Sequence, residues 1–200
     1  RCRYEPGGGA RVSDTAHLRA ARPSAEEQTP HWSRQRVCPD LYIEIAATAQ
    51  DKSLLAGLGV THVVNAADGP RRISTGPRFY EGTGIRYHGV EAADCRDFDL
   101  SPFFTETADF IHAALEQKGK VLVHCARGIS RSATLALAFL MIRERLTLVE
   151  AVEAVRRHRN VLPNVGFLNQ LCRLDSSLAL QRKTPKRQEL EERRKGGISP

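Results

Sequence analysis

The chain has 200 residues, of which 41% are hydrophobic and 26% are charged, a composition that suits one globular domain with modest tails. No apolar run reaches the ~18 to 20 residues that a membrane-spanning helix needs, and no apolar segment follows a basic start, so we expect neither a membrane partner nor secretion. The net charge of +7 comes from the two ends, whereas residues 38–181 carry sixteen charges of each sign; nucleic acid is therefore not an expected partner.

The five cysteines are odd in number and scattered along the chain: Cys2, Cys38, Cys95, Cys125 and Cys172. None of them forms a C-x-x-C pair, so neither a disulfide framework nor a zinc site is expected, and we predict no metal and no cofactor. Reduced thiols fit a cytoplasmic location. Two basic clusters near the C-terminus make the nucleus a second candidate, although a solubilising tail is the favoured interpretation of these clusters.

The first 36 residues contain a triple glycine and little apolar periodicity, which predicts a disordered N-terminal segment at 1–36. The sequence then alternates in the rhythm of an α/β domain. In chain order we predict a strand at 41–45, a helix at 48–58 that ends at Gly59, a strand at 61–65, a loop at 68–77 and a strand at 86–90.

The second half of the domain is predicted to be largely helical. Ser101 and Pro102 suit the N-cap and the first position of a helix that runs to Gln117 and stops at Gly119. A short apolar run at 121–124 then predicts a buried central strand. Further helices are predicted at 131–144, at 148–159 behind a capping box of Thr147 and Glu150, and at 165–178 behind Asn164.

These elements predict a single α/β domain at residues 37–180, with a central, mostly parallel sheet flanked by helices. Residues 181–200 mix basic and acidic clusters, which predicts a basic C-terminal tail that is flexible or partly helical. The sequence leaves the oligomeric state open.

One stretch carries the chemistry: V-L-V-H-C-A-R-G-I-S-R-S-A, which starts at Val121. Its frame H-C-x-x-G-x-x-R-S places Cys125 at the end of a strand and Arg131 in the first turn of a helix. A loop that curls at Gly128 can turn successive backbone N–H groups inward, and the helix N-terminus adds the positive end of its dipole. Together with the planar fork of Arg131, this arrangement predicts a site for a phosphate dianion.

A thiol in such a field has a pKa lowered from about 8.5 to roughly 3.5 to 7.5. Cys125 is therefore predicted to attack phosphorus as a thiolate and to form a thiophosphoryl intermediate. Ser132 is placed to hydrogen-bond the sulfur and help it leave, and His124 is expected to orient the loop. The alternative for an isolated cysteine is a buried core residue, but here strand, glycine, arginine and helix coincide at fixed spacing.

The other loop residues are predicted to bind substrate: Ala126, Arg127, Gly128, Ile129 and Ser130. Hydrolysis also needs a proton donor for the leaving oxygen, and three aspartates precede the helix that starts near Ser101: Asp94, Asp97 and Asp99. A surface loop after a strand suits a general acid. Spacing alone does not select one of the three.

Residues 41–178 resemble the small atypical dual-specificity phosphatases, the VHR-like branch of the protein tyrosine phosphatase superfamily. The resemblance rests on G-V-T-H-V-V-N-A-A from Gly59, on Asp94 with F-D-L-S from Phe98, on H-C-A-R-G-I-S-R-S-A-T-L, and on R-N-V-L-P-N-V-G-F-L-N-Q-L from Arg159. It implies a cysteine-phosphatase fold and a phosphatase that acts on phosphotyrosine and on phosphoserine or phosphothreonine in proteins, signalling kinases among them.

The resemblance also implies roles for single residues. Asp94 takes the place of the family's general acid, Asn164 would brace the phosphate loop, and Arg159 matches a position that reaches a second phosphate on the peptide in relatives. Arg127 and Arg159 could form a basic rim that favours peptides with acids or a second phosphate; the alternative is that both are solvated surface arginines. Glu44 departs from the pattern, because relatives usually place glycine there.

Two rival functions remain open. A pseudophosphatase would keep the fold but lose the nucleophile or the arginine, and both are present here. A phosphatase for lipid or RNA phosphates is the second rival; phosphoinositide enzymes tend to carry lysines where this loop has Ala126 and Ile129.

Overall fold

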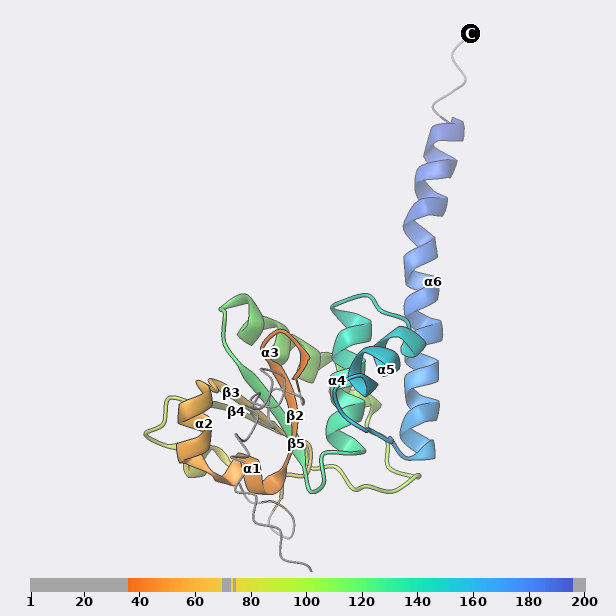
Figure 1. The fold of residues 1–200 in the computed structure, drawn as a ribbon. Helices are drawn as coiled ribbons and strands as arrows, with labels where there is room; N and C mark the ends of the chain where they lie inside the picture. Colours follow the sequence, from red (N-terminus) through yellow and green to blue (C-terminus); the bar gives the residue numbers. More distant parts are fainter. Residues whose placement is uncertain (1–35, 70–72, 74, 196–200) are drawn as a thin grey trace, which may run out of the picture. The chain divides into compact units, whose positions relative to one another are not determined.

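The computed structural model describes residues 36–69, 73 and 75–195, all of which lie in the compact unit His31–Pro200. The predictions for residues 1–35 and for part of the loop at 68–77 lie outside the described residues. Five strands form one sheet in the order β1 (Arg36–Cys38), β2 (Leu41–Ile45), β5 (Val121–Cys125), β3 (His62–Asn65) and β4 (Arg86–Gly89) (Figure 1). Only β1 pairs antiparallel, so the predicted mostly parallel sheet is confirmed.

Six α-helices and two short 3₁₀ helices complete the described part of the chain: α1 (Ala46–Gln50), α2 (Lys52–Leu58), η2 (Pro77–Tyr80), η3 (Ser101–Phe103), α3 (Phe104–Glu116), α4 (Arg131–Ile142), α5 (Leu148–Arg156) and α6 (Val165–Lys195). In Figure 1, α4, α5 and α6 lie together at one side of the sheet, and α1 and α2 lie at the other. Within the described residues, no helix combines the length and the apolar character that crossing a bilayer requires.

Successive residues of each strand point to opposite faces of a sheet, and the strands here bury both. Val121 and Val123 of β5 belong to the core that α3 to α6 cover, whereas Leu122 between them belongs to a smaller core with Leu55 of α2 and Tyr80 of η2. Because both faces are covered, β5 reads as a continuous apolar run rather than an alternating one.

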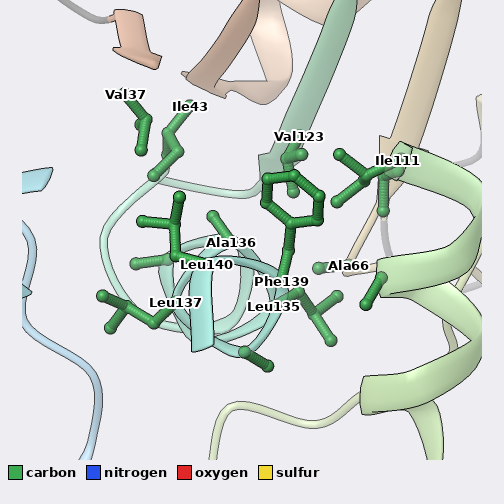
Figure 2. Close-up of a cluster of buried hydrophobic side chains, with 14 of the residues drawn as sticks. Val37, Ile43, Ala66, Ile111, Val123, Leu135, Ala136, Leu137, Phe139 and Leu140 are labelled. Carbon is green, nitrogen blue, oxygen red and sulfur yellow. The ribbon is translucent and has the colours of Figure 1, made fainter. Parts of the chain in front are cut away.

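The larger core is built around α4, whose residues 131–141 are all buried. Figure 2 shows side chains of α4, Phe139 and Leu140 among them, gathered with Val123 of β5, Ile43 of β2 and Ile111 of α3. A helix that is apolar on all sides must be buried. This packing fixes the start of α4, and with it the arginine of the motif, against the end of β5.

The structure confirms the predicted central strand and the caps closest to the motif. β5 is the central strand, Thr147 and Glu150 form the capping box of α5, and the side chain of Asn164 accepts a hydrogen bond from the backbone N–H of Phe167 at 3.0 Å. Gly59 ends α2 in the left-handed conformation, with a φ of 71°.

Several element boundaries differ from the prediction: three strands differ by one residue at one end, and the helices differ as follows. The helix predicted at 48–58 is divided at Asp51, because the Asp51 side chain accepts from the N–H of Leu54 and starts a second helix. Ser101 is not an N-cap: it opens a 3₁₀ helix, and its hydroxyl donates to Asp99, which also accepts from the Ser101 N–H. The helices predicted to end at 144 and 159 end at Ile142 and Arg156.

Two further differences lie at the ends of the domain. β1 was not predicted, because three residues are too few to show a strand period. α6 was predicted to end at Leu178 but continues to Lys195. The apolar periodicity stops before that point, yet residues 179–195 are rich in Leu, Gln, Arg, Lys and Glu, which have high helix propensity without needing an apolar face.

Candidate active site

Cys125 is the last residue of β5, at the edge where the carboxyl ends of the parallel strands meet. Ligand sites of open α/β sheets form at this edge. The Cys125 residue is 1% exposed. The loop that follows, residues 126–130, connects it directly to Arg131, the first residue of α4.

Every backbone carbonyl of this loop accepts a hydrogen bond from outside the loop. Ala126 O accepts from Ala46 N, Ile129 O from Leu162 N and Ser130 O from Thr134 N, at 3.4, 3.0 and 2.8 Å. The carbonyls of Arg127 and Gly128 accept from Arg159, at 3.4 and 2.9 Å. Since the N–H and C=O of a trans peptide point in opposite directions, carbonyls held on the outside leave the N–H groups facing the interior of the loop. This is the anion-binding nest that the sequence predicts.

Hydrogen bonds converge on the thiol inside the loop. Gly128 N donates to Cys125 Sγ at 3.2 Å, and Ser132 Oγ donates to the same sulfur at 3.3 Å. Burial alone would raise the pKa of the Cys125 thiol, but the Ser132 hydroxyl and the backbone N–H groups of Ser132, Ile129 and Arg127 outweigh it, so that the pKa is lowered. The thiolate is thus favoured where the sequence predicts the nucleophile.

Arg131 is held beside the loop by two neighbours. Its Nη1 donates to Ala92 O at 3.1 Å, and its Nε lies 3.6 Å from Asp94 Oδ2. The Arg131 side chain is 11% exposed, and Nε has no hydrogen-bond partner within the described part of the chain. Because a buried guanidinium N–H without a partner is costly, Arg131 has donor capacity available for an anion in the loop.

The three candidate aspartates lie in different surroundings. Asp94 Oδ1 accepts from Ser130 Oγ at 2.7 Å, so Asp94 lies against the loop. The Asp97 side chain is 89% exposed and contacts Arg96. Asp99 accepts a hydrogen bond from the Ser101 hydroxyl. Of the three, the geometry brings Asp94 to the site.

Asn164 connects this network to α6. Its Nδ2 donates to Asp94 Oδ1 at 3.0 Å, its backbone N–H donates to Ser130 Oγ at 3.2 Å, and its Oδ1 caps α6. The resemblance implied that Asn164 braces the phosphate loop. The structure shows that it contacts both the loop, through Ser130, and Asp94.

Arg159 lies elsewhere than expected. The sequence placed it with Arg127 on a basic rim, but the Arg159 side chain is 12% exposed and donates to the carbonyls of Arg127 and Gly128, whereas Arg127 itself is exposed. Arg159 Nη1 lies 4.0 Å from Glu44 Oε2. A contact with substrate is thus not what its geometry favours. Glu44 was not predicted as part of the site; its departure from the family pattern was the signal that could have identified it.

His124 precedes Cys125 in the chain and is fully buried. Burial lowers the pKa of His124 to about 4. The ring is therefore neutral at physiological pH. It cannot hold the loop through a charged contact, and a hydrogen bond to the backbone of Cys125 is the contact through which it can orient the loop.

An open pocket of about 430 Å³ adjoins the loop, lined by Ala67, Ile73, Ala93, Asp94, Ala126 and Arg131. Among the described residues, its walls are mostly small apolar side chains, and the polar groups are those of Asp94 and Arg131. Across residues 36–69, 73 and 75–195, no group of three or more His, Cys, Asp or Glu side chains has an arrangement that could hold a metal ion.

Comparison with known proteins agrees with this geometry. The family model described as dual specificity phosphatase, catalytic domain, matches residues 41–177. The chain is 55% identical over 156 residues to dual specificity protein phosphatase 13B of Homo sapiens, covering 74% of this chain and 79% of that protein. It is 53% identical over 143 residues to dual specificity protein phosphatase 26 of Bos taurus, covering 71% and 67%.

Among solved structures, the crystal structure of human DUSP28 is similar, with a TM-score of 0.65 and 32% identity, over 73% of this chain and 98% of that one. The matched segment contains the nucleophile, the arginine and the aspartate described above. The chain therefore belongs to the dual specificity phosphatases, enzymes that remove phosphate from tyrosine and from serine or threonine in proteins.

Proposed function

We propose that this chain dephosphorylates proteins through a cysteinyl-phosphate intermediate on Cys125. The observation that carries the proposal is the inward ring of N–H groups around Cys125 Sγ, produced by a loop whose carbonyls are all bonded on the outside. Such preorganised donors stabilise the charge that develops on the phosphoryl oxygens. The Arg131 fork adds a charged, bidentate contact to two of these oxygens.

In the first step the Cys125 thiolate attacks phosphorus, a P–S bond forms, and the P–O bond to the substrate side chain breaks. Asp94 supplies the proton that the leaving oxygen needs. In the second step a water molecule attacks phosphorus, Asp94 accepts its proton, and the P–S bond breaks to release inorganic phosphate. The Ser132 hydroxyl donates to the departing sulfur and stabilises the thiolate that is regenerated.

The open pocket beside Asp94 and Arg131 supports dual specificity. Its walls of Ala67, Ala93 and Ala126 leave space for the ring of phosphotyrosine. The same openness lets the shorter side chains of phosphoserine and phosphothreonine bring their phosphate to the loop without a deep channel to cross.

A panel of substrates tests the proposal. Phosphotyrosine and phosphothreonine peptides should be hydrolysed, whereas inositol lipid phosphates and an RNA 5′-triphosphate should be poor substrates; Cys125→Ser protein is the blank. Chelator should leave the rate unchanged, because the arginine and N–H groups already balance the phosphate charge. A rate on lipid or RNA that exceeds the rate on peptides would overturn the protein-substrate assignment.

We further propose that the enzyme works in a reducing compartment, the cytoplasm and also the nucleus. Support comes from the chemistry of Cys125: a thiolate is the form that hydrogen peroxide oxidises to sulfenic acid. Peroxide should inactivate the enzyme and thiol reductant should restore it. Fluorescence microscopy of the tagged full chain would test the location, and confinement to a secretory compartment would contradict it.

A further inference from the structure

Arg159 contacts the outside of the phosphate loop through two hydrogen bonds to backbone carbonyls. Its Nε donates to Gly128 O at 2.9 Å and its Nη2 donates to Arg127 O at 3.4 Å. It is thus bonded to two consecutive peptide planes of the loop. Only a planar guanidinium fork can hold two acceptors in this way with fixed geometry.

The N–H groups of these two peptide planes are among those that face the thiol. The described part of the chain contains no cis peptide bond, so the plane that presents Arg127 O outward presents Gly128 N–H inward, and the plane that presents Gly128 O presents Ile129 N–H. Gly128 N lies 3.2 Å from Cys125 Sγ, and the Ile129 N–H also interacts with this sulfur. The direction of both inward donors is therefore tied to Arg159.

Glu44 fixes Arg159 in turn. The carboxylate is 4% exposed, and its Oε2 lies 4.0 Å from Arg159 Nη1 while it also accepts from Ile45 N and Thr48 Oγ1, at 3.3 and 3.1 Å. The end of β2 and the start of α1 thereby hold the carboxylate in place. A buried carboxylate is costly unless it is paired, and Arg159 is its charged partner.

The packing around Gly128 leaves this arrangement little freedom. Gly128 has a φ of +63°, and a Cβ at this position would lie 2.5 Å from Arg159 Nη2 and 2.6 Å from Glu44 O. Arg159, Glu44 and Gly128 are thus in mutual contact directly beneath the peptide planes that form the nest.

We propose that Arg159, fixed by Glu44, is a positioning residue that aims the N–H groups of Gly128 and Ile129 into the phosphate loop. The inference rests on the proposed function, and it assigns neither residue to contact with substrate. Its measurable consequence is the ionisation of Cys125, because the same N–H groups that would bind phosphoryl oxygens stabilise the thiolate in the empty site.

Other charged or titratable groups near the loop also contribute to the electrostatic field at Cys125. They are Arg131 from α4, Asp94 from the loop after β4, Asp68 after β3, exposed Arg127 in the loop itself, and His124 on β5. His124 is neutral above its pKa of about 4. The test must therefore change the geometry at Arg159 without changing its charge. Arg159→Lys does this, since an ammonium keeps the charge but lacks the planar fork.

The pKa of Cys125 can be measured from the rate of iodoacetamide alkylation against pH, with Cys125 resolved from the other cysteines by mass spectrometry of its peptide. Arg159→Lys should raise this pKa by about one unit, the size expected for loss of a hydrogen bond to a charged group. Arg157→Lys, at an exposed position two residues away, is the matched control and should leave it unchanged. An Arg159→Lys value equal to wild type overturns the proposal.

Glu44→Gln provides an independent variant, because it retains an acceptor oxygen but removes the charge beside Arg159. Removing a negative charge near the thiol would by itself lower the Cys125 pKa, whereas release of Arg159 would raise it. The direction in which the Cys125 pKa changes therefore distinguishes the two effects. A rise supports the role of Glu44, and an unchanged or lowered pKa overturns it. Alkylation needs no turnover, so this result can be read even if the chain fails to hydrolyse phosphopeptides.

Discussion

Asn164 Nδ2 donates to Asp94 Oδ1 at 3.0 Å, joining the start of α6 to the loop that follows β4. The amide cannot turn over without losing the cap of α6, because Asn164 Oδ1 accepts from the N–H of Phe167. Ser130 Oγ donates to the same carboxylate oxygen at 2.7 Å. With Oδ1 engaged by two donors, Oδ2, the oxygen that faces Arg131, is the one left to carry the proton that the proposed reaction transfers.

Two substitutions at Asn164 separate its contact with Asp94 from its role as a cap. Asn164→Ser should retain the cap, since serine is a good N-cap residue, but its short side chain cannot replace the bond to Asp94. We expect kcat/KM on phosphothreonine peptides to fall about tenfold, the typical effect of losing one hydrogen bond of ~1.5 kcal/mol to a charged group, with little change in Tm. Asn164→Ala should show the same kinetic loss and also cost about 1 kcal/mol of stability. Equal Tm values for the two variants would contradict the assignment of the cap.

Asp94→Asn tests the general acid through the leaving group. Expulsion of a serine or threonine alkoxide depends on proton donation, whereas a strongly acidic phenol leaves without it. General acid catalysis contributes typically ~10²- to 10⁴-fold, so kcat on phosphothreonine peptides should fall by about that factor and distinctly less on an activated aryl phosphate. Steady-state assays on both substrates measure the difference.

The matched controls for Asp94 are its two neighbours. Asp97→Asn, at a side chain that is 89% exposed, and Asp99→Asn, which alters a contact with Ser101, should leave the leaving-group dependence intact. If Asp97→Asn rather than Asp94→Asn shows the selective loss, the assignment of the acid is wrong.

The parts of the site that depend on short sequence spacing could be predicted from the sequence. A strand end, a glycine loop and a helix start lie within residues 121–132, so local geometry alone brings Cys125, Gly128 and Arg131 together. The parallel sheet followed similarly from the alternation of strands and helices. In these stretches local propensity and the tertiary structure agree.

The parts that depend on distant contacts could not be predicted. Arg159 and Glu44 are separated by most of the domain, and nothing in either local sequence indicates that one guanidinium will be used on loop carbonyls rather than on substrate. The choice among Asp94, Asp97 and Asp99 likewise needed the fold, because Ser130 and Asn164 select Asp94 from outside its own loop. Ser101 shows a local competition: its hydroxyl and its N–H both donate to Asp99, so the serine side chain does not cap the helix.

Gly128→Ala should disable the loop, whereas Gly84→Ala should not. Both glycines have left-handed backbone, with φ values of +63° and +74°, but a Cβ at 84 meets nothing within 4 Å, while one at 128 would overlap Arg159 and Glu44. Gly84→Ala should therefore cost only the strain of about 1 kcal/mol and keep full kcat. Gly128→Ala should lose kcat at least ~100-fold, since displaced donors no longer face the phosphoryl oxygens. Thermal unfolding and phosphopeptide turnover measure the two effects, and a fully active Gly128→Ala protein would be inconsistent with the loop described here.

Ser132→Ala should make the enzyme more sensitive to acid. The Ser132 hydroxyl is among the groups that keep the pKa of Cys125 below its ordinary value, so its removal should raise that pKa, and the acid limb of kcat/KM should move to higher pH by about one unit. Activity then falls more at pH 6 than at pH 8. Because Ser132 is also proposed to stabilise the departing sulfur, rapid-quench experiments should show a burst of leaving group followed by slow turnover. Ser176→Ala, at an exposed site on α6, should change neither.

Burial of His124 should make the stability of the domain fall in mild acid. Its pKa is lowered to about 4 in the folded chain from the ordinary histidine value of about 6.5, so between these two pH values the unfolded chain binds a proton that the folded chain does not. Stability therefore rises with pH across this window and is lost as the pH falls from 6.5 towards 4, by up to ~3 kcal/mol from this residue. His62 and His88, whose pKa values burial also lowers, act in the same direction.

His124→Gln removes the titrating ring, so the free energy of unfolding, measured by urea denaturation at several pH values, should depend less steeply on pH between 4 and 6.5 than in the wild type. The comparison uses slopes, because the substitution also changes packing at every pH. A residual slope from His62 and His88 should remain. His158→Gln, at an exposed position after α5, controls for removal of a histidine as such. If His124→Gln retains the wild-type slope between pH 4 and 6.5, the His124 ring is not buried as a neutral group.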